Sequence, residues 1–303
     1  MSRLEENKAK AQHFIECLPY VQKFHGKTIV VKYGGNAMLN EELKEAVFRD
    51  IILMNLIGIR TVLVHGGGPD IEDYLKRLDI KSDFKSGLRV TDEAVMETVS
   101  MVLVGKVNQN TVSEINRLGG KAVGLSGKDG SMLRCVKKYA RIKDGNGIHK
   151  VDIGMVGEVQ QVDCTLINGM LDDLYIPVIA PIGTDDEGHT YNVNADIAAG
   201  KIASALGAMK LFLLTDVEGL YRDFNDKSSL ITRLSVDDVE DLVKAGSISK
   251  GMIPKLESCV NAIRDGVENV HIIDGRVPHS LLLELFTDSG IGTMLTRGGA
   301  ADA

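Results

Sequence analysis

Apolar residues along the chain follow two patterns: short runs that predict buried strands, and longer stretches with helical spacing. The strand-like runs cover 28–31, 61–64, 122–125, 176–180, 210–214 and 270–273. The helical stretches lie between them, at 41–57, 69–78, 92–118, 165–174, 197–206, 235–244, 255–263 and 280–286. This alternation predicts an α/β fold with an open, mainly parallel, doubly wound sheet sandwiched by helices.

Three further segments complete the predicted chain. Residues 133–162 alternate around a turn sequence at 144–147 and predict hairpins, and 290–295 predict a turn and a final edge strand. Residues 4–18 predict an N-terminal helix that ends or kinks at Pro19. That helix either packs on its own domain or forms an arm that meets another subunit, and the pattern favours neither.

Composition excludes several classes of protein. The chain has 303 residues and a formal net charge of −7, which argues against a nucleic-acid surface. Its four cysteines are far apart and form no CxxC pair, so we expect reduced thiols and a cytoplasmic protein. No apolar stretch approaches the ~18 residues of a membrane helix. Charges throughout the N-terminal stretch argue against a signal peptide.

Two of the predicted strands end in glycines. The first runs into Lys32-Tyr33-Gly34-Gly35, and the second runs into His65-Gly66-Gly67-Gly68 just before Pro69, which suits the first turn of a helix. Glycines let a ligand approach the backbone, and a helix N-terminus offers N–H donors and a positive dipole end. We therefore expect a site for a carboxylate or a phosphate. We expect His65 to be structural, and with no Cys/His cluster in the sequence around it we assign no metal ligand.

Three charged residues also lie at predicted helix starts. Arg89 precedes a helix that begins at 92, where its fork either holds a ligand carboxylate or forms a surface salt bridge. Asp196 lies in the first turn of an Ala-rich helix, as a functional carboxylate or a plain cap. Lys255 starts a helix whose dipole disfavours a cation, so we expect an anion nearby.

Two nucleotide-binding motifs are absent. Residues 126–130 contain a Gly-Lys pair but lack the glycine that a P-loop carries five residues earlier. No G-x-G-x-x-G sequence occurs, which argues against a dinucleotide-binding dehydrogenase.

Taken together, the motifs resemble those of the N-acetyl-L-glutamate kinases of the amino-acid kinase family, from about residue 10 to about residue 295. The stretches that carry the resemblance are Val31-Lys32-Tyr33-Gly34-Gly35-Asn36-Ala37-Met38, His65-Gly66-Gly67-Gly68-Pro69, Gly87-Leu88-Arg89-Val90-Thr91, Asn192-Val193-Asn194-Ala195-Asp196 and Gly251-Met252-Ile253-Pro254-Lys255. The resemblance implies that ATP, with Mg²⁺ held mainly by the nucleotide, phosphorylates the side-chain carboxylate of N-acetyl-L-glutamate in arginine biosynthesis. No residue is implied as a metal ligand.

The resemblance also implies a role for each matching residue. Lys32 and Lys255 would stabilise the transferring phosphoryl group, and Asp196 would hold both lysines. The substrate-binding matches are Gly67, Gly68, Arg89 and Asn192, and the backbone donors to the phosphate are Gly34 and Gly35. The nucleotide-site matches are Thr215, Asp216, Val217, Glu218, Gly219, Leu220, Ser247, Ile248 and Ser249.

The two ends of the chain resemble the arginine-inhibited members of this family, which are hexamers built as trimers of dimers with interlaced N-terminal helices. The implied arginine contacts are Tyr20, Arg222, Glu284, Gly290 and Gly292. A PII-type signalling protein is a further possible partner. We expect an N-terminal arm at 1–25, an acetylglutamate-binding lobe at 26–192 and an ATP-binding lobe at 193–303.

Two alternatives stay open at this point. One is a sister kinase that acts on glutamate, aspartate, carbamate or UMP, and the other is a non-catalytic arginine sensor. The chain ends too soon for the extra C-terminal domain of aspartate kinases. Intact Lys32, Asp196 and Lys255 argue against a silent sensor.

Overall fold

The computed structural model describes residues 2–38, 40–144, 147–223, 226–244, 248 and 252–298. The α-helices are α1 (Arg3–Glu16), α2 (Leu18–Phe24), α3 (Glu41–Leu56), α4 (Gly68–Arg77), α5 (Glu93–Ser100), α6 (Gln109–Arg117), α7 (Thr165–Asp172), α8 (Ala195–Ala205), α9 (Val236–Lys244), α10 (Ile253–Arg264) and α11 (Ser280–Leu285). Short 3₁₀ helices are η1 (Gly35–Met38), η3 (Asp129–Ser131) and η4 (Lys227–Ser229). The segment η2 (Met101–Asn108) is a π-helix.

Strands make up the centre of the molecule. They are β1 (Thr28–Tyr33), β2 (Arg60–His65), β3 (Phe84–Lys85), β4 (Leu88–Arg89), β5 (Ala122–Ser126), β6 (Leu133–Asp144), β7 (Gly147–Val162), β8 (Ile176–Ala180), β9 (Ile182–Thr184), β10 (Thr190–Asn192), β11 (Lys210–Thr215), β12 (Leu220–Tyr221), β13 (Leu230–Ile231), β14 (Arg233–Ser235), β15 (Asn269–Asp274) and β16 (Thr293–Thr296). The main sheet has eight strands in the order β14-β16-β15-β11-β1-β2-β8-β5. Only the β15–β16 pair in it is antiparallel, which confirms the predicted open, mainly parallel sheet.

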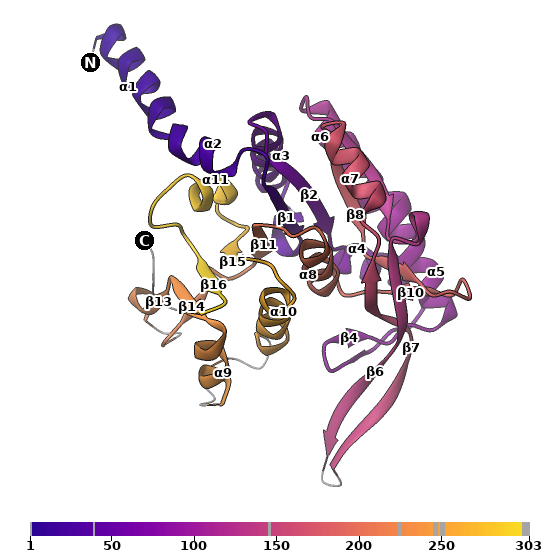
Figure 1. Cartoon of the computed structure of the whole chain (residues 1–303). Helices are drawn as coiled ribbons and strands as arrows, with labels where there is room; N and C mark the ends of the chain where they lie inside the picture. Colours follow the sequence, from indigo (N-terminus) through magenta and orange to yellow (C-terminus); the bar gives the residue numbers. More distant parts are fainter. Residues whose placement is uncertain are drawn as a thin grey trace.

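Both faces of the main sheet are covered by helices, as Figure 1 shows. Successive residues of β1 face opposite sides, because side chains alternate along a strand. Val30 packs on one side with residues of α7, α8, α9 and α10. Ile29 and Val31 pack on the other side with residues of α2, α3, α6 and α11. This burial on both faces explains why the strands read as continuous apolar runs.

The parallel strands bring their carboxyl ends to one edge of the sheet. In register, Tyr33 of β1 lies beside His65 of β2, and Lys32 lies beside Leu213 of β11. The chain leaves β1 toward β2 on one side, while β11 occupies the other side. This is the position in an open α/β sheet where ligands bind.

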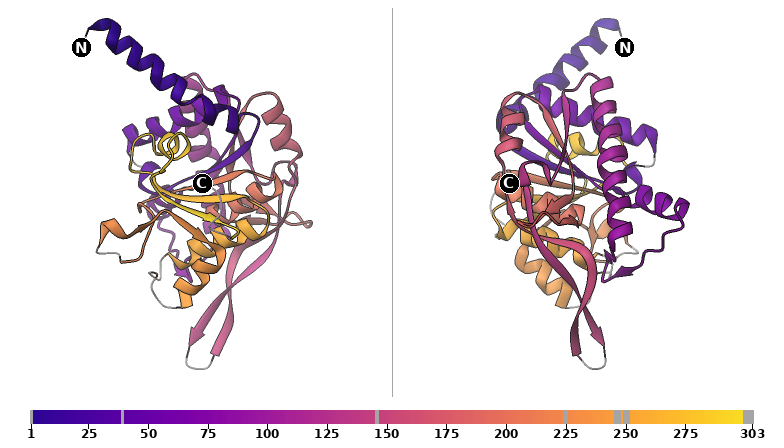
Figure 2. Two further views of the ribbon diagram at one scale, coloured as in Figure 1. Left: turned by 60° about the vertical axis from the view of Figure 1, so that its left-hand side comes forward. Right: turned by 90° about the vertical axis from the view of Figure 1, so that its right-hand side faces the viewer.

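A second, closed four-stranded sheet forms beside the first from β6, β7, β9 and β10. Its strands β6 and β7 form one long hairpin that projects from the body of the molecule in Figures 1 and 2. The sequence predicted hairpins over this stretch but did not predict that they would form a separate sheet.

One strand prediction is wrong. Residues 293–296 do not form an edge strand, because β14 pairs along the outer side of β16. The sequence assigned Ser235 to the start of a helix, whereas it ends β14 and the helix α9 begins at Val236. Strand β14 spans three residues with Leu234 as its one buried side chain, too short a pattern for a period to be read.

The N-terminal helix is divided where Pro19 was expected to end or kink it, with Pro19 in the first turn of α2. Helix α1 has no buried residue, and Figures 1 and 2 show it pointing away from the rest of the chain. Leu4, Phe14 and Ile15 are therefore exposed apolar side chains on an extended helix. Among the described residues, no helix is long and apolar enough to cross a membrane.

Candidate active site

Two lysines and one aspartate meet at the carboxyl edge of β1. The Nζ of Lys32 lies 3.0 Å from Oδ1 of Asp196, and the Nζ of Lys255 lies 2.8 Å from Oδ2. The side chains are 12, 15 and 21 % exposed for Lys32, Asp196 and Lys255 respectively. The anion that we expected near Lys255 is therefore Asp196 itself. The catalytic roles of the three residues stay a prediction.

Three separate elements supply these side chains. Strand β1 ends at the cluster, and helices α8 and α10 begin there. Lys32 is the penultimate residue of the central strand. Asn194 caps α8 by accepting hydrogen bonds from the backbone N–H groups of Asp196 and Ile197, which fixes Asp196 in the first turn. Pro254 lies in the first turn of α10 and directs Lys255 toward the same point.

The electrostatics of the cluster are dominated by the two ammonium groups. Burial alone would raise the pKa of the Asp196 carboxyl, but the adjacent lysines outweigh it and hold that pKa well below its usual range. Oδ1, which faces Lys32, has no aligned hydrogen-bond partner among the described atoms. Its contact with Lys32 is thus an ion pair, whereas Oδ2 accepts an aligned hydrogen bond from Lys255.

The two glycine-rich turns lie against each other, and the first of them also lies against Lys32 of the lysine cluster. The N–H of Gly66 donates to the carbonyl of Tyr33 over 2.8 Å, which joins the ends of β1 and β2. A Cβ added to Gly34 would lie 2.6 Å from Nζ of Lys32, so that ammonium group folds back over the turn. Gly35 has a φ of +71°, a conformation that favours glycine.

Arg89 and Asn192, the predicted substrate contacts, are joined by one threonine. Thr91 donates its hydroxyl to the carbonyl of Arg89 at 2.8 Å and accepts from the Asn192 amide at 3.3 Å. The Arg89 side chain is only 7 % exposed and lies 3.2 Å from Glu72. Its guanidinium therefore forms an ion pair, as one of our alternatives had it, between a buried arginine and an exposed glutamate.

Glu72 is a partner that the sequence did not predict. It lies on α4, the helix that begins at Gly68, so α4 connects the second glycine turn to Arg89. Beside this ion pair lies a cavity of about 320 Å³, whose lining includes Glu72, Ser82 and Arg89. A charged residue on the exposed face of an amphipathic helix gives no signal that it will contact a distant arginine.

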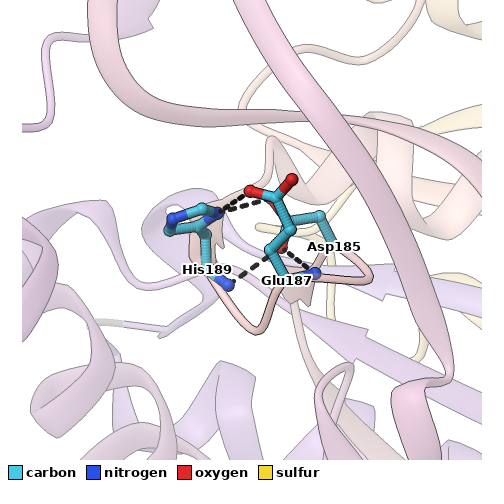
Figure 3. A group of neighbouring side chains, drawn as sticks. All are labelled: Asp185, Glu187 and His189. Carbon is cyan, nitrogen blue, oxygen red and sulfur yellow. Dashed lines mark hydrogen bonds and ion pairs between the residues drawn. The ribbon is translucent and has the colours of Figure 1, made fainter.

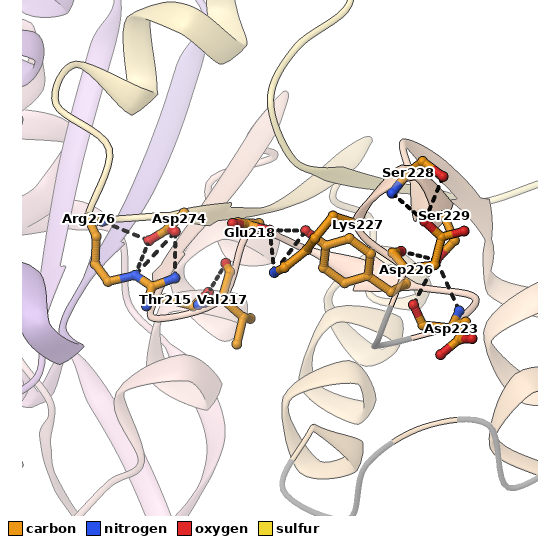
Figure 4. A network of polar contacts seen from close by, with 11 residues as sticks. Thr215, Val217, Glu218, Asp223, Asp226, Lys227, Ser228, Ser229, Asp274 and Arg276 are labelled. Atoms are coloured by element: carbon orange, nitrogen blue, oxygen red, sulfur yellow. Dashed lines mark hydrogen bonds and ion pairs between the residues drawn. The ribbon is translucent and has the colours of Figure 1, made fainter.

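The predicted nucleotide residues follow the end of β11. Thr215 exchanges hydrogen bonds with Val217, and a Cβ added to Gly35 would lie 2.6 Å from Oδ1 of Asp216. Asp216 thus lies directly against the first glycine turn. Glu218 points toward Lys227 in Figure 4, and its carboxylate lies 2.7 Å from the Lys227 Nζ.

The rest of the predicted nucleotide set is less defined. Leu220 donates its N–H to the hydroxyl of Thr293, which a Cβ on Gly219 would approach to 2.6 Å. Ile248 packs against the core on the side of α9 and α10. Ser247 and Ser249 lie outside the described residues. Figure 4 also shows Arg276 held by Asp274 at the end of β15, the strand next to β11.

Comparison with known proteins assigns the family. A model of the amino acid kinase family matches residues 27–274. An acetylglutamate kinase from Heliobacterium modesticaldum is 57 % identical over 95 % of this chain and 98 % of the relative. One from Methanococcus maripaludis is 48 % identical over 96 % of this chain and 99 % of the relative. This chain belongs to the acetylglutamate kinases of the amino acid kinase family. The resemblance inferred from the motifs is confirmed.

Solved structures share the fold of this acetylglutamate kinase family member. N-acetylglutamate synthase from Neisseria gonorrhoeae, complexed with coenzyme A and N-acetyl-glutamate, has a TM-score of 0.80 and 27 % identity over 95 % of this chain. This chain spans only 64 % of that synthase chain. The same synthase complexed with coenzyme A and L-arginine has a TM-score of 0.78, with 26 % identity. Carbamate kinase from Giardia lamblia bound to AMP-PNP, at 15 % identity and TM-score 0.66, matches in fold alone over 90 % of this chain and 99 % of its own.

A second buried polar cluster in this family member lies at the opposite end of β11. Lys210 begins the strand, and its Nζ lies 2.7 Å from Nε2 of His271, whose Nδ1 lies 2.7 Å from Glu284. Glu284 also accepts the N–H groups of Ile291 and Gly292. Burial lowers the pKa of Lys210 to about 8 and that of His271 to about 4. His271 is therefore neutral and connects a cation to a carboxylate.

This cluster contains most of the predicted arginine contacts. A Cβ added to Gly290 would lie 2.6 Å from Glu284, so Glu284, Gly290 and Gly292 are together. Tyr20 of α2 donates its hydroxyl to Asp288 of the same loop. Arg222 is exposed on another part of the chain, and no contact among the described residues joins it to Glu284. Lys210 and His271 were missed, although a lysine opening a buried apolar strand is a usable signal.

A third polar group lies in the turn between β9 and β10, where Asp185, Glu187 and His189 face one another in Figure 3. The Asp185 carboxylate accepts the N–H groups of Glu187 and His189, and also bonds the His189 ring and the Tyr191 hydroxyl. These bonds define an Asx-type turn. The turn accounts for the grouping without a ligand.

The depressed pKa of Asp196 predicts a specific dependence of stability on pH. Because its folded pKa lies below the unfolded value of about 3.9, the carboxylate stabilises the fold above that value. That contribution is lost as the pH falls toward the folded pKa.

We expect Asp196→Asn to have a lower free energy of unfolding than the wild type at neutral pH, and this gap should narrow as the pH falls below about 4. Urea unfolding over this pH range measures the gap. A gap that is independent of pH would contradict the assignment.

Proposed function

We propose that the protein transfers the terminal phosphoryl group of ATP to the side-chain carboxylate of N-acetyl-L-glutamate, in the second step of arginine biosynthesis. The products are N-acetyl-L-glutamyl 5-phosphate and ADP. The observation that carries this proposal is the Lys32–Asp196–Lys255 cluster at the carboxyl edge of β1, beside the first glycine-rich turn. Acetylglutamate kinases at 48 to 57 % identity support the same substrate.

The reaction needs positioning and charge stabilisation more than proton transfer. An oxygen of the substrate carboxylate attacks the γ-phosphorus while the bond from that phosphorus to the ADP oxygen breaks. The carboxylate has a reference pKa of about 4.3, so it is already ionised at neutral pH and needs no general base. His65 is not available as a base, because it is fully buried and burial lowers its pKa to about 4.

Lys32 and Lys255 approach the transferring group from two directions, and Asp196 keeps both from turning away. The cluster carries one net positive charge, which favours the charge that spreads over the phosphoryl oxygens in the transition state. The backbone N–H groups of Gly34 and Gly35 lie beside Lys32 and add donors to the same oxygens. Mg²⁺ enters with ATP as part of the substrate and neutralises its phosphate chain.

The substrate would be held on the side of β2 and β4. The N–H groups of Gly67 and Gly68 face the acceptor carboxylate, and Arg89 and Asn192 hold the rest of the N-acetylated amino acid. The Thr91 bridge between Arg89 and Asn192 supports a joint role. Glu72 competes for the Arg89 guanidinium and presets its direction before substrate binds.

The nucleotide would be held on the side of β11, by residues 215–220 and Ile248, together with Ser247 and Ser249. The contact of Asp216 with Gly35 supports a nucleotide site beside the first glycine turn. The lobes proposed at 26–192 and 193–303 then share one sheet, with β1 from the first lobe paired to β11 from the second. A movement of one lobe against the other would change the distance between Lys32 and Lys255.

Two other functions are weaker. A sister kinase for glutamate, aspartate or carbamate would have no N-acyl group for Arg89 and Asn192 to hold, and Thr91 links these two residues here. A non-catalytic sensor would not need the lysine cluster that Asp196 holds together.

Acyl phosphate formation tests the proposed reaction. With ATP, Mg²⁺ and N-acetyl-L-glutamate, we expect hydroxylamine to trap a hydroxamate, and no signal above background with free glutamate, aspartate or carbamate. Purified Asp196→Asn protein serves as the blank for kinases that copurify. Signal with free glutamate or aspartate but not with N-acetyl-L-glutamate would sink the assignment.

We further propose that L-arginine inhibits the enzyme by binding at Glu284, between α2 and the 286–292 loop. Glu284 would pair with the guanidinium, and Gly290, Gly292 and Tyr20 would line the site. Arg222 is exposed and no contact among the described residues joins it to Glu284, so we propose that Lys210 pairs with the arginine carboxylate. Charge complementarity supports this choice, since a cation and a carboxylate flank His271.

The exposed apolar side chains of α1 support a hexameric trimer of dimers in which the N-terminal helices interlace. The base of this arm touches the proposed arginine site through Tyr20 and Phe24. A PII-type protein remains a proposed partner, and the cytoplasm the proposed location, consistent with four free cysteines.

Effector variants test the arginine site. We expect Glu284→Gln and Lys210→Met each to raise the arginine concentration for half-inhibition by at least about tenfold, the loss expected when a charged hydrogen bond is removed. Arg222→Met is the matched control and should leave inhibition unchanged. Helix α1 (Arg3–Glu16) has no buried residue, so removing residues 1–16 should reduce oligomer size in sedimentation while catalysis persists. Loss of inhibition in Arg222→Met alone would restore the original assignment.

A further inference from the structure

A π-helical segment lies directly beneath the second glycine turn. Residues Met101–Asn108 (η2) interrupt a continuous helix made by α5, η2 and α6. Such segments are rare, and they often occur at functional sites. A Cβ added to Gly67 would lie 2.5 Å from Leu103 and 3.5 Å from Val107. The segment therefore forms the floor on which the proposed carboxylate-binding turn rests.

Asn108, the last residue of this segment, is 1 % exposed and joins three strands. Its Nδ2 lies 2.8 Å from the carbonyl oxygen of Val178 and 3.1 Å from Nε2 of His65. A Cβ on Gly124 would lie 2.1 Å from its Oδ1, so the amide is wedged against β5. Because a carbonyl can only accept, the amide atom facing Val178 must be the nitrogen. The same nitrogen then donates to His65.

This donation fixes the tautomer of His65. Nε2 accepts from Asn108, so the single proton of the neutral ring lies on Nδ1. Nδ1 lies 2.7 Å from the carbonyl oxygen of Gly66 and donates to it. The ring is 0 % exposed, and burial lowers its pKa to about 4. The nearby charge of Asp70 opposes that shift, and it is itself paired with Lys106 at 2.8 Å.

The direction of these two hydrogen bonds determines where the next peptide points. The Gly66–Gly67 peptide is trans, so its C=O and N–H groups point in opposite directions. Holding the Gly66 carbonyl on the histidine side turns the Gly67 N–H to the other side. Because neither residue has a Cβ, the flanking φ and ψ angles alone would allow several orientations of this peptide plane.

We propose that Asn108 and His65 form a one-way hydrogen-bond relay that orients the Gly66–Gly67 peptide, so that the Gly67 N–H faces the acceptor carboxylate of the substrate. Both are positioning residues, since neither touches substrate in this arrangement. The inference rests on the proposed role of Gly67 in substrate binding. It adds the reason why a buried histidine precedes the three glycines.

Kinetics of matched variants test the relay. Asn108→Asp is nearly isosteric but replaces the donor with an acceptor, which forces a proton onto Nε2. We expect the KM for N-acetyl-L-glutamate to rise by about tenfold, the loss of one hydrogen bond to a charged group. The KM for ATP and kcat should change by less than about threefold. Asn110→Asp, with the same charge change on an exposed residue of the same helix, should behave as the wild type.

Histidine variants separate the relay from simple packing. Asn mimics the Nδ1 donor of histidine, whereas Gln mimics Nε2, so His65→Asn should retain a lower substrate KM than His65→Gln. Equal KM values for the two variants, or a rise as large in Asn110→Asp as in Asn108→Asp, would overturn the proposal.

Imidazole ¹⁵N NMR tests the tautomer independently of catalysis. The His65 signals are assigned by their absence from His65→Asn, and we expect a neutral ring with the proton on Nδ1 at neutral pH. A proton on Nε2 would refute the relay even if the hydroxylamine assay supports the reaction. A correct tautomer in a protein without acetylglutamate kinase activity would leave the relay intact and overturn the function.

Discussion

One carboxylate between two ammonium groups is the constraint on which the rest of the structure depends. Asp196 lies 3.0 Å from Lys32 and 2.8 Å from Lys255. Without it, two like charges in a largely buried site would repel each other and leave the sheet edge. The central strand ends at this contact, and helices α8 and α10 begin at it. A buried ion group of this kind is weak evidence for stability, and its position at the carboxyl edge of the sheet is why we propose a functional role for it.

The two ends of β11 carry different polar clusters, and we propose that one serves catalysis and the other arginine regulation. At its carboxyl end, Asp216 lies against Gly35 of the first glycine turn. At its start, Lys210 connects through His271 to Glu284 and to the loop that touches α2. A strand of this length spans about 17 Å. A ligand bound at the start of β11 therefore lies within one rigid element of the active site, and a shift of the strand would move Asp216 relative to Gly35.

Much of the fold followed from the sequence because it depends on local patterns. The buried strands of the parallel sheet are continuous apolar runs, and the glycine turns and Pro69 are local signals. The β14 strand and the closed second sheet did not follow, because three-residue strands and hairpin closure depend on distant partners. The site was predictable where motifs carry it, as at Lys32, and unpredictable where tertiary contact makes it, as for Glu72 with Arg89 and Asn108 with His65. Arg222 is exposed and has no described contact with Glu284, and its role in arginine binding stays a prediction.

We propose that the lysine cluster stabilises the transition state of phosphoryl transfer rather than the bound substrates. The most direct measurement is the affinity of wild type, Lys32→Ala and Asp196→Asn for MgADP, aluminium fluoride and N-acetyl-L-glutamate, compared with their affinity for MgATP. Lys201→Ala, an exposed ion-paired lysine on the same helix as Asp196, is the control. We expect Lys32→Ala and Asp196→Asn each to lose about 100-fold or more in affinity for the aluminium fluoride complex, and less than about threefold in affinity for MgATP. Equal losses for both ligands, or none for the analogue, would contradict it.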